Sequence, residues 1–173
     1  LPIDTYKPEI DELHQEPLHL DWDSLRQDIL QYGLRNSTLT ALMPSETSSQ
    51  ISNATNGIEF PRDKIVVKAS KDGILKQVIP ELLVLKDEYE YLWGMENCRS
   101  YLYMVAIMQK FIDQAISANT SYDPSRYENN KVPMRDMLHD LLLAYRYGVK
   151  TLYYHNTRDG ASDEQEDDAC SSG

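Results

Sequence analysis

Residues 133–154 read PMRDMLHDLLLAYRYGVKTLYY and indicate a helix followed at once by a strand. Pro133 is at a favoured first-turn position, and a glycine such as Gly148 commonly ends a helix. The β-branched and aromatic residues from Val149 to Tyr154 have strand composition. Apolar residues cover one side of the helix and widen towards a second apolar face: Met134, Leu138, Leu141, Leu142 and Tyr145, with Leu143, Ala144 and Tyr147.

Three more helices are expected upstream. Asp21 is a typical helix cap, and the apolar spacing after it predicts a helix that Gly33 ends. Residues 82–93 predict a second helix, ended by Gly94. A third has one apolar stripe at helical spacing, formed by Tyr101, Val105, Met108, Ile112 and Ile116. Residues 119–131 are expected to form a loop.

Few strands are visible before the final one. Residues 39–43 indicate a short buried strand that Pro44 ends. The β-branched runs at 65–67 and 74–79 flank an Asp-Gly turn at 70–73, which predicts a hairpin. Two or three strands make a poor sheet by themselves, so we expect another polypeptide to complete it.

At 173 residues the chain is about one ordinary domain long. Its 17 Lys and Arg against 28 Asp and Glu give a net charge of −11, which is concentrated at the two ends. Residues 1–30 and 159–173 each carry −6, so the middle is nearly neutral. This balance argues against non-specific nucleic-acid binding. Because no apolar run is long enough for a bilayer and the first residues lack signal-peptide features, we also expect no membrane association.

The two ends are expected to differ from the middle. Residues 1–20 contain three prolines and no clean period, which is typical of a linker or surface arm. From Asp159 onward the chain has no apolar residue larger than alanine apart from Cys170, so a flexible acidic tail is predicted. Cys98 and Cys170 are too few for a disulfide-stapled secreted domain, which favours a cytoplasmic location. Neither lies at metal-ligand spacing, and no metal is expected.

A first candidate site is the string PSETSSQ at residues 44–50. A helix that begins here would present unpaired backbone N–H groups and hydroxyls to a phosphate. Because two anions repel, Glu46 could offer only its backbone N–H. The alternative is that Thr47 and Gln50 form a capping box, which satisfies the same N–H groups within the chain.

A second candidate is the pair Tyr153 and Tyr154, whose adjacent phenols could pass an electron and a proton between them. Successive side chains of a strand face opposite sides, so pairing the two rings requires a bulge or irregular backbone. The alternative is two half-buried aromatic residues in an ordinary strand.

A third candidate is Cys170, a thiol on a mobile arm. The six carboxylates nearby are unlike the electropositive setting of an activated thiolate, so a chance surface cysteine is the alternative. Cys98 is expected to be a small buried residue near a helix start. We assign no catalytic role to a histidine.

These candidates occur in an order that resembles the C-terminal part of the large (alpha, R1) subunit of class Ia ribonucleotide reductase. The most specific strings are PSETSSQISNATNGIE at 44–59 and KTLYY at 150–154. Other matching stretches, which together run almost the length of the chain, are LPIDTY, KASKDGIL, IMQKFIDQAISANTSYDPSR and GVKTLYYHNTRDGA. The resemblance implies an α/β fold in which residues 1–158 complete a ten-stranded barrel and residues 159–173 form a redox tail.

The resemblance also implies a role for each candidate. The diphosphate of a ribonucleoside diphosphate would be bound at a helix N-terminus by Ser45, Glu46, Thr47 and Ser48. Tyr153 and Tyr154 would be the stacked pair that passes radical character from the small (beta, R2) subunit towards an active-site cysteine. Residues 134–147 would form part of the groove for the C-terminal tail of that small subunit.

Cys170 resembles the first cysteine of the family's tail. That tail re-reduces the active-site disulfide by thiol exchange and is itself reduced by thioredoxin or glutaredoxin. The family pattern has a second tail cysteine, whereas residues 171–173 are Ser-Ser-Gly.

The implied activity is the reduction of ribonucleoside diphosphates to deoxyribonucleoside diphosphates by radical chemistry, with this chain as an incomplete subunit that needs its N-terminal remainder. No cofactor is expected in the chain, since the family's di-iron tyrosyl radical belongs to the small subunit. ATP and dNTP effectors would bind parts that the sequence lacks. The alternative is a non-catalytic interaction module, or the remnant of a disrupted reductase gene.

Overall fold

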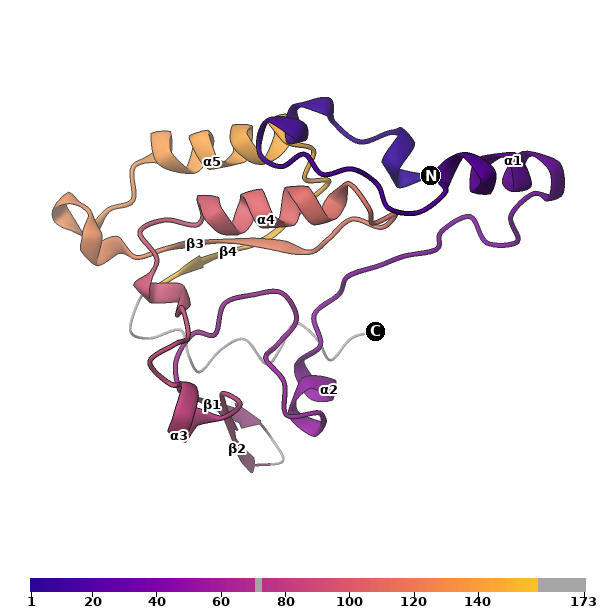
Figure 1. Ribbon diagram of the computed structural model, residues 1–173. Coiled ribbons are helices and arrows are strands. Elements are labelled where there is room, and N and C mark those ends of the chain that lie inside the picture. Colours follow the sequence, from indigo (N-terminus) through magenta and orange to yellow (C-terminus); the bar gives the residue numbers. More distant parts are fainter. Residues whose placement is uncertain (71–72, 159–173) are drawn as a thin grey trace.

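The computed structural model describes residues 1–70 and 73–158. Its central unit is a strand–helix–strand segment: β3 (Ala118–Tyr122), α5 (Met134–Arg146) and β4 (Leu152–Thr157). β3 and β4 pair in parallel, since a helical crossover returns the chain in the direction of the first strand. Figure 1 shows α5 together with α4 (Arg99–Gln109) on one side of the β3–β4 pair.

The hydrophobic core lies between these helices and strands. Its buried residues come mainly from α4, β3 and α5: Cys98, Tyr101, Leu102, Val105, Ile116, Ala118, Leu143 and Ala144. Burial alternates along β3, with Ala118, Thr120 and Tyr122 inside, as expected for a strand with one covered face. Leu102 is fully buried, so truncating it to alanine would cost about 2 to 5 kcal/mol.

The predicted hairpin is confirmed. β1 (Ile65–Ser70) and β2 (Gly73–Val78) pair antiparallel. In Figure 1 the hairpin lies away from α4 and α5, in the part of the molecule that also holds α2 (Glu46–Ile51) and α3 (Leu82–Leu85). Over the described residues, β1–β2 and β3–β4 are two separate two-stranded sheets.

The first predicted helix is also confirmed, as α1 (Trp22–Tyr32). The Asp21 carboxylate accepts a hydrogen bond from the Ser24 N–H at 2.9 Å and caps the helix start. Gly33 ends the helix with a φ of 75°, which glycine adopts without strain. No residue of α1 is buried, and in Figure 1 the helix extends away from the core.

Residues 39–43 do not form the predicted strand. The N–H groups of Leu39 and Thr40 donate to the Asp113 carboxylate at 2.9 and 3.2 Å. The Thr40 carbonyl accepts from the Gln114 N–H at 3.1 Å. A strand requires a ladder of backbone pairs, whereas here a side chain takes two consecutive N–H groups.

Two predicted helices are shorter than expected. The helix predicted over 82–93 is reduced to α3 and a 3-10 turn at Leu92–Gly94, since α3 buries no apolar face and Leu83 is 93% exposed. The stripe predicted to reach Ile116 is helical only as far as Gln109. The Gln109 side chain bonds the backbone of residues 112, 114 and 116, which holds the chain in a non-helical turn.

The loop predicted over 119–131 is wrong in its first four residues, because residues 119–122 belong to β3. Asn, Ser and Pro are common in turns, and their density near Asp123–Ser125 concealed the short alternation of the strand. The strand predicted over 149–154 is present but begins three residues later, as β4.

α5 confirms the predicted helix, but it begins one residue later than expected, since Pro133 is its N-cap and not a first-turn residue. Leu143 and Ala144 are buried against the core. The long apolar stripe faces outward instead, and its side chains are between 50% and 74% exposed: Met134, Leu138, Leu141, Leu142 and Tyr145. The helix therefore has two apolar faces, and the larger of them is exposed.

Residues 1–12 pack on the layer formed by α4 and α5. They form two 3-10 helices, Pro2–Asp4 and Pro8–Glu12, and bury Ile3 and Ile10. Asp11 accepts a hydrogen bond from the Lys110 ammonium at 2.7 Å. Figure 1 shows this segment beside α5 and α4.

Candidate functional site

A cleft of about 940 Å³ runs between the α2 region and the start of β4. Its walls come from residues 42–45, residues 54–63, the β1–β2 hairpin and β3. Ser45 and Ser48 line one part of it, and Tyr153 and Tyr154 line another: two of the three candidate groups therefore share one cavity.

The start of α2 is held by the turn that follows the helix. Ser45 is the N-cap residue, and its side chain makes no capping hydrogen bond. Its N–H donates to the Asn56 side-chain oxygen and its hydroxyl accepts from the Gly57 N–H, both at 3.1 Å. Gly57 has a φ of 60°, a left-handed conformation that glycine adopts without strain.

This geometry contradicts the capping box considered for Thr47 and Gln50. The helix begins at Glu46 with Ser45 as its cap, so Thr47 lies inside the first turn. The first turn of a helix has N–H groups without intrahelical partners. Ser48, also in that turn, is exposed, and its hydroxyl donates to the Ser45 carbonyl at 3.4 Å.

The tyrosine pair lies at an irregularity of the β3–β4 ladder. Ala118 is opposite Leu152, but Thr120 is opposite His155, so β4 has one extra residue between these two pairs. The extra length contains Tyr153 and Tyr154 and is the irregular backbone that pairing requires.

The two phenols are consequently close to each other. Their ring centroids are 4.1 Å apart, but the ring planes are inclined by 54°, so the rings are tilted and not stacked as the resemblance implied. The Tyr154 hydroxyl donates to the Tyr153 hydroxyl at 3.3 Å. Tyr153 is 55% exposed and Tyr154 39%, so the pair is accessible rather than sealed in the core.

The side chains that support this pair were not among the predicted site residues. Asn119 on β3 accepts a hydrogen bond from the Tyr154 N–H at 2.9 Å and donates to the Glu59 carboxylate. Thr120 is fully buried, and its hydroxyl is 2.6 Å from Nδ1 of His155. Asn119 and Thr120 belonged to the predicted loop. The alternation of residues 118–122 was the signal that could have identified them.

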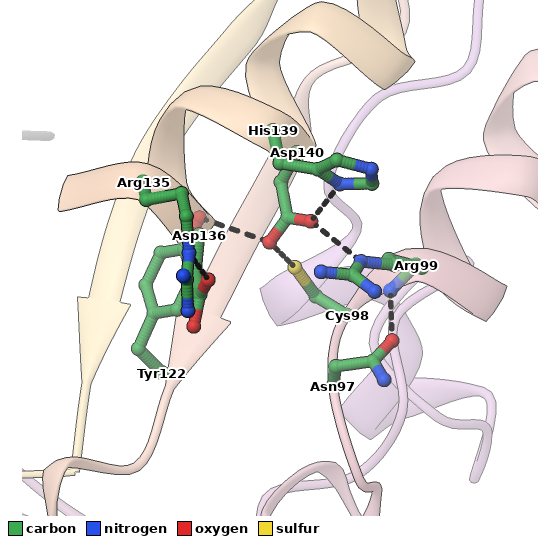
Figure 2. Close-up of polar contacts among 8 residues, drawn as sticks. All are labelled: Asn97, Cys98, Arg99, Tyr122, Arg135, Asp136, His139 and Asp140. Atoms are coloured by element: carbon green, nitrogen blue, oxygen red, sulfur yellow. Dashed lines mark hydrogen bonds and ion pairs between the residues drawn. The ribbon is translucent and has the colours of Figure 1, made fainter. Parts of the chain in front are cut away.

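A second polar cluster surrounds the buried carboxylate of Asp140 on α5 (Figure 2). It accepts hydrogen bonds from the Arg99 guanidinium at 2.9 Å, the Tyr122 hydroxyl at 3.3 Å and the Cys98 thiol at 3.6 Å. His139 is 3.6 Å from the same carboxylate. These contacts join α4, β3 and α5. Because the partners of Asp140 on α4 and β3 are far from it in the sequence, no local motif indicates the cluster.

The electrostatics of this cluster favour a structural role for Cys98 over a role as a reactive thiolate. Burial, with the Asp140 charge adding to it, raises the pKa of Cys98 to about 11. The hydrogen bond to Asp140 raises the pKa of the Arg99 guanidinium above its usual value. Cys98 is 3% exposed at the N-cap of α4, which confirms the small buried residue expected there.

The third candidate, Cys170, lies outside the described residues. Over residues 1–70 and 73–158, no group of three or more His, Cys, Asp or Glu side chains is arranged to hold a metal ion. None of the helices described in that part of the chain has the length and apolar character to cross a bilayer.

Comparison with known proteins covers nearly the whole chain. The family model "Ribonucleotide reductase, barrel domain" matches residues 1–92 and 83–155. The ribonucleoside-diphosphate reductase subunit alpha of Haemophilus influenzae is 69% identical over 100% of this chain. The alpha subunit of ribonucleoside-diphosphate reductase 1 of Escherichia coli is 63% identical over 100%, and the enterobacteria phage T4 alpha subunit is 48% identical over 93%.

The matched region is a small part of each relative. The chain spans 23% of the Haemophilus influenzae protein, 24% of the Escherichia coli protein and 22% of the phage protein. The mixed helices and strands, with a parallel pair joined by a helix, agree with an α/β barrel segment. The chain belongs to the ribonucleotide reductase barrel-domain family.

Proposed function

We propose that this chain is the C-terminal segment of the large subunit of a ribonucleoside-diphosphate reductase, and that it binds the diphosphate of the substrate and relays a radical. The observation that carries the proposal is the shared cleft, which is lined by the start of α2 and by both tyrosines. Relatives that cover the whole chain bear the name of that enzyme.

The diphosphate would lie at the start of α2. Backbone N–H groups of the first turn and the Ser48 hydroxyl are suitable donors, and Arg62 also lines the cleft. Ser45 would act mainly by holding the loop, because its hydroxyl and N–H both bond the 56–57 turn. Glu46 and Thr47 lie in the first turn and would contribute their backbone N–H groups.

Tyr153 and Tyr154 would exchange a hydrogen atom. When one phenol is a phenoxyl radical, the other gives it an electron and its hydroxyl proton. One O–H bond thus breaks as the other forms, and the radical moves by one residue. The 3.3 Å separation of the hydroxyls supports this role, because proton transfer requires donor and acceptor within about hydrogen-bond distance.

The exposed stripe of α5 would receive the C-terminal tail of the small subunit. The small subunit would carry the di-iron tyrosyl radical. An apolar helix face beside a groove is a recurrent docking surface for peptides, and the side chains of this stripe are half exposed or more. ATP and dNTP effectors would bind the preceding part of the subunit.

In the cytoplasm the Cys170 thiolate would attack the active-site disulfide, forming a mixed disulfide and releasing one active-site thiol. The dithiol of thioredoxin or glutaredoxin would then resolve this mixed disulfide, which restores Cys170 and the second active-site thiol and leaves the dithiol oxidised. Disulfide reduction by dithiols occurs through mixed disulfides, and a reducing compartment maintains the thiols.

The test uses the complete large subunit that contains this segment, together with its small subunit. We expect the assembly to reduce ribonucleoside diphosphates, and Ser48→Ala to raise the KM for substrate more than it lowers kcat. Cys170→Ser should slow thioredoxin-driven turnover and spare turnover driven by a small dithiol. An assembly that binds the small subunit but reduces no nucleotide would instead favour an interaction module.

A further inference from the structure

We infer that Asn119 is the positioning residue that keeps Tyr153 and Tyr154 paired. The inference rests on the relay role proposed above and deepens it. It assigns the geometry of the relay to one side chain on the neighbouring strand.

The inference begins with the backbone of the irregular strand. An extra residue in a ladder leaves a backbone group without its regular partner, and the extra residue of β4 falls between Leu152 and His155. The Tyr154 N–H in this stretch donates to the side-chain oxygen of Asn119 at 2.9 Å. Asn119 lies between Ala118 and Thr120, the two β3 residues that bound the register shift. Its side chain therefore takes the place of a ladder carbonyl.

The other half of the Asn119 amide fixes its orientation. Its nitrogen donates to the Glu59 carboxylate, and Glu59 lines the same cleft as the tyrosines. An ionised carboxylate only accepts hydrogen bonds and a backbone N–H only donates. The amide thus satisfies both neighbours in one orientation, with its oxygen towards Tyr154, and a flipped amide would oppose both.

This arrangement predicts an effect on transfer rather than on substrate binding. Losing the Asn119 side chain would remove the hydrogen bond that holds the Tyr154 N–H at the bulge, so the 3.3 Å separation of the hydroxyls could lengthen. A misplacement of about 1 Å can reduce a rate by about a hundredfold. The start of α2 is held by the 56–57 turn, not by Asn119, so affinity for the diphosphate should be retained.

The first experiment compares Asn119→Leu with Asn97→Leu in the complete, assembled enzyme. Asn97 is the matched control, because its side-chain oxygen also accepts a backbone N–H, that of Arg99 at 3.0 Å, away from the tyrosines. We expect Asn119→Leu to lower kcat by about tenfold to a hundredfold with KM within about twofold of the parent, and Asn97→Leu to leave both near the parent values. An equal effect of the two variants, or a rise in KM that accounts for the loss, overturns the inference.

The second experiment is a rescue, which covers the case that Asn119→Leu folds poorly. Asn119→Asp keeps an acceptor for Tyr154 but places a second anion against Glu59, and like charges at this distance repel. Glu59→Gln restores a donor–acceptor pair with reversed roles. We expect Asn119→Asp alone to lose kcat, and the double variant to recover to the level of Glu59→Gln alone. Absence of recovery contradicts the inference.

Tyr153→Phe and Tyr154→Phe are measured in the same assay. If they retain full turnover, the relay role fails, and the inference fails with it. If they abolish turnover while Asn119→Leu behaves like Asn97→Leu, the relay stands and only the positioning role of Asn119 is wrong.

Discussion

The Tyr154 hydroxyl donates a hydrogen bond to the Tyr153 hydroxyl at 3.3 Å, although the two residues are consecutive in one strand. Regular strand geometry would direct their side chains to opposite faces. The register shift between Ala118 and Thr120 removes that constraint. The pairing is therefore a property of the β3–β4 ladder and not of the Tyr-Tyr sequence alone.

Replacing either phenol by phenylalanine should stop turnover without unfolding the protein. Tyr153→Phe and Tyr154→Phe each delete the hydroxyl that gives or accepts the hydrogen atom, and a positioned proton-transfer group is typically worth about a hundredfold or more. Both side chains are at least 39% exposed, so the change in stability should stay within about 0.5 kcal/mol. Steady-state nucleotide reduction measures the first effect, and circular dichroism melting the second. Normal turnover in either variant would contradict the relay.

The sequence was sufficient for elements whose signals are local. The helix at Trp22–Tyr32 has its own cap and its own terminating glycine, and the hairpin has a turn between β-branched runs. The predictions for residues 118–122 and 39–43 were wrong because their structure depends on residues distant in the sequence. A strand exists only where a partner strand pairs with it. Residues 118–122 have such a partner in β4, whereas residues 39 and 40 bond to Asp113.

The candidate site was predictable to a similar extent. The hydroxyl-rich string at 44–50 and the two tyrosines are visible as motifs, and the structure brings them to one cleft. Asn119 and Glu59 are 60 residues apart, and Cys98 and Asp140 are 42 apart. Contacts over such distances depend on the tertiary fold, so no spacing rule could have paired them.

Removing the Asp140 carboxylate should loosen α5 from α4. Asp140→Ala removes the carboxylate that accepts hydrogen bonds from the Cys98 thiol and the Tyr122 hydroxyl, and it removes the anion hydrogen-bonded to Arg99. We expect the free energy of local opening of α5 to fall by about 2 to 3 kcal/mol, measured by amide hydrogen exchange. Asp136→Ala on the same helix is the control. Its pair with the exposed Arg135 should contribute only about 0.5 kcal/mol, and equal effects of the two variants would show that the Asp140 cluster is not special.

Alkaline pH should destabilise the fold partly through Cys98. The ordinary thiol pKa of 9.0 applies to the unfolded chain, while burial holds the folded value at about 11. Below pH 9 both states carry a neutral thiol. Between pH 9 and 11 only the unfolded state ionises, so about 2 kcal/mol of stability should be lost as pH rises.

Urea unfolding of the complete subunit at several pH values tests this dependence, with Cys98→Ala as the comparison. The variant should lose stability less steeply above pH 9. Some slope should remain, because burial also raises the pKa of Tyr101 and Tyr122 above the ordinary value of 10.0. Identical slopes for parent and variant would contradict the assignment.

A charge on the exposed stripe of α5 should weaken docking of the small subunit. Leu141 is 50% exposed and lies outside the core, so Leu141→Glu should leave the fold intact while placing an anion in an apolar contact. Residues that dominate an interface typically contribute more than about 1 kcal/mol to the binding free energy. A loss of about 1.4 kcal/mol raises the Kd about tenfold. Fluorescence anisotropy with a labelled peptide of the small-subunit tail measures the effect. Leu83→Glu is the matched control, since Leu83 is equally apolar, 93% exposed and located on α3. Weakening by Leu141→Glu alone assigns the tail to α5, because a general effect of added negative charge would appear in both variants.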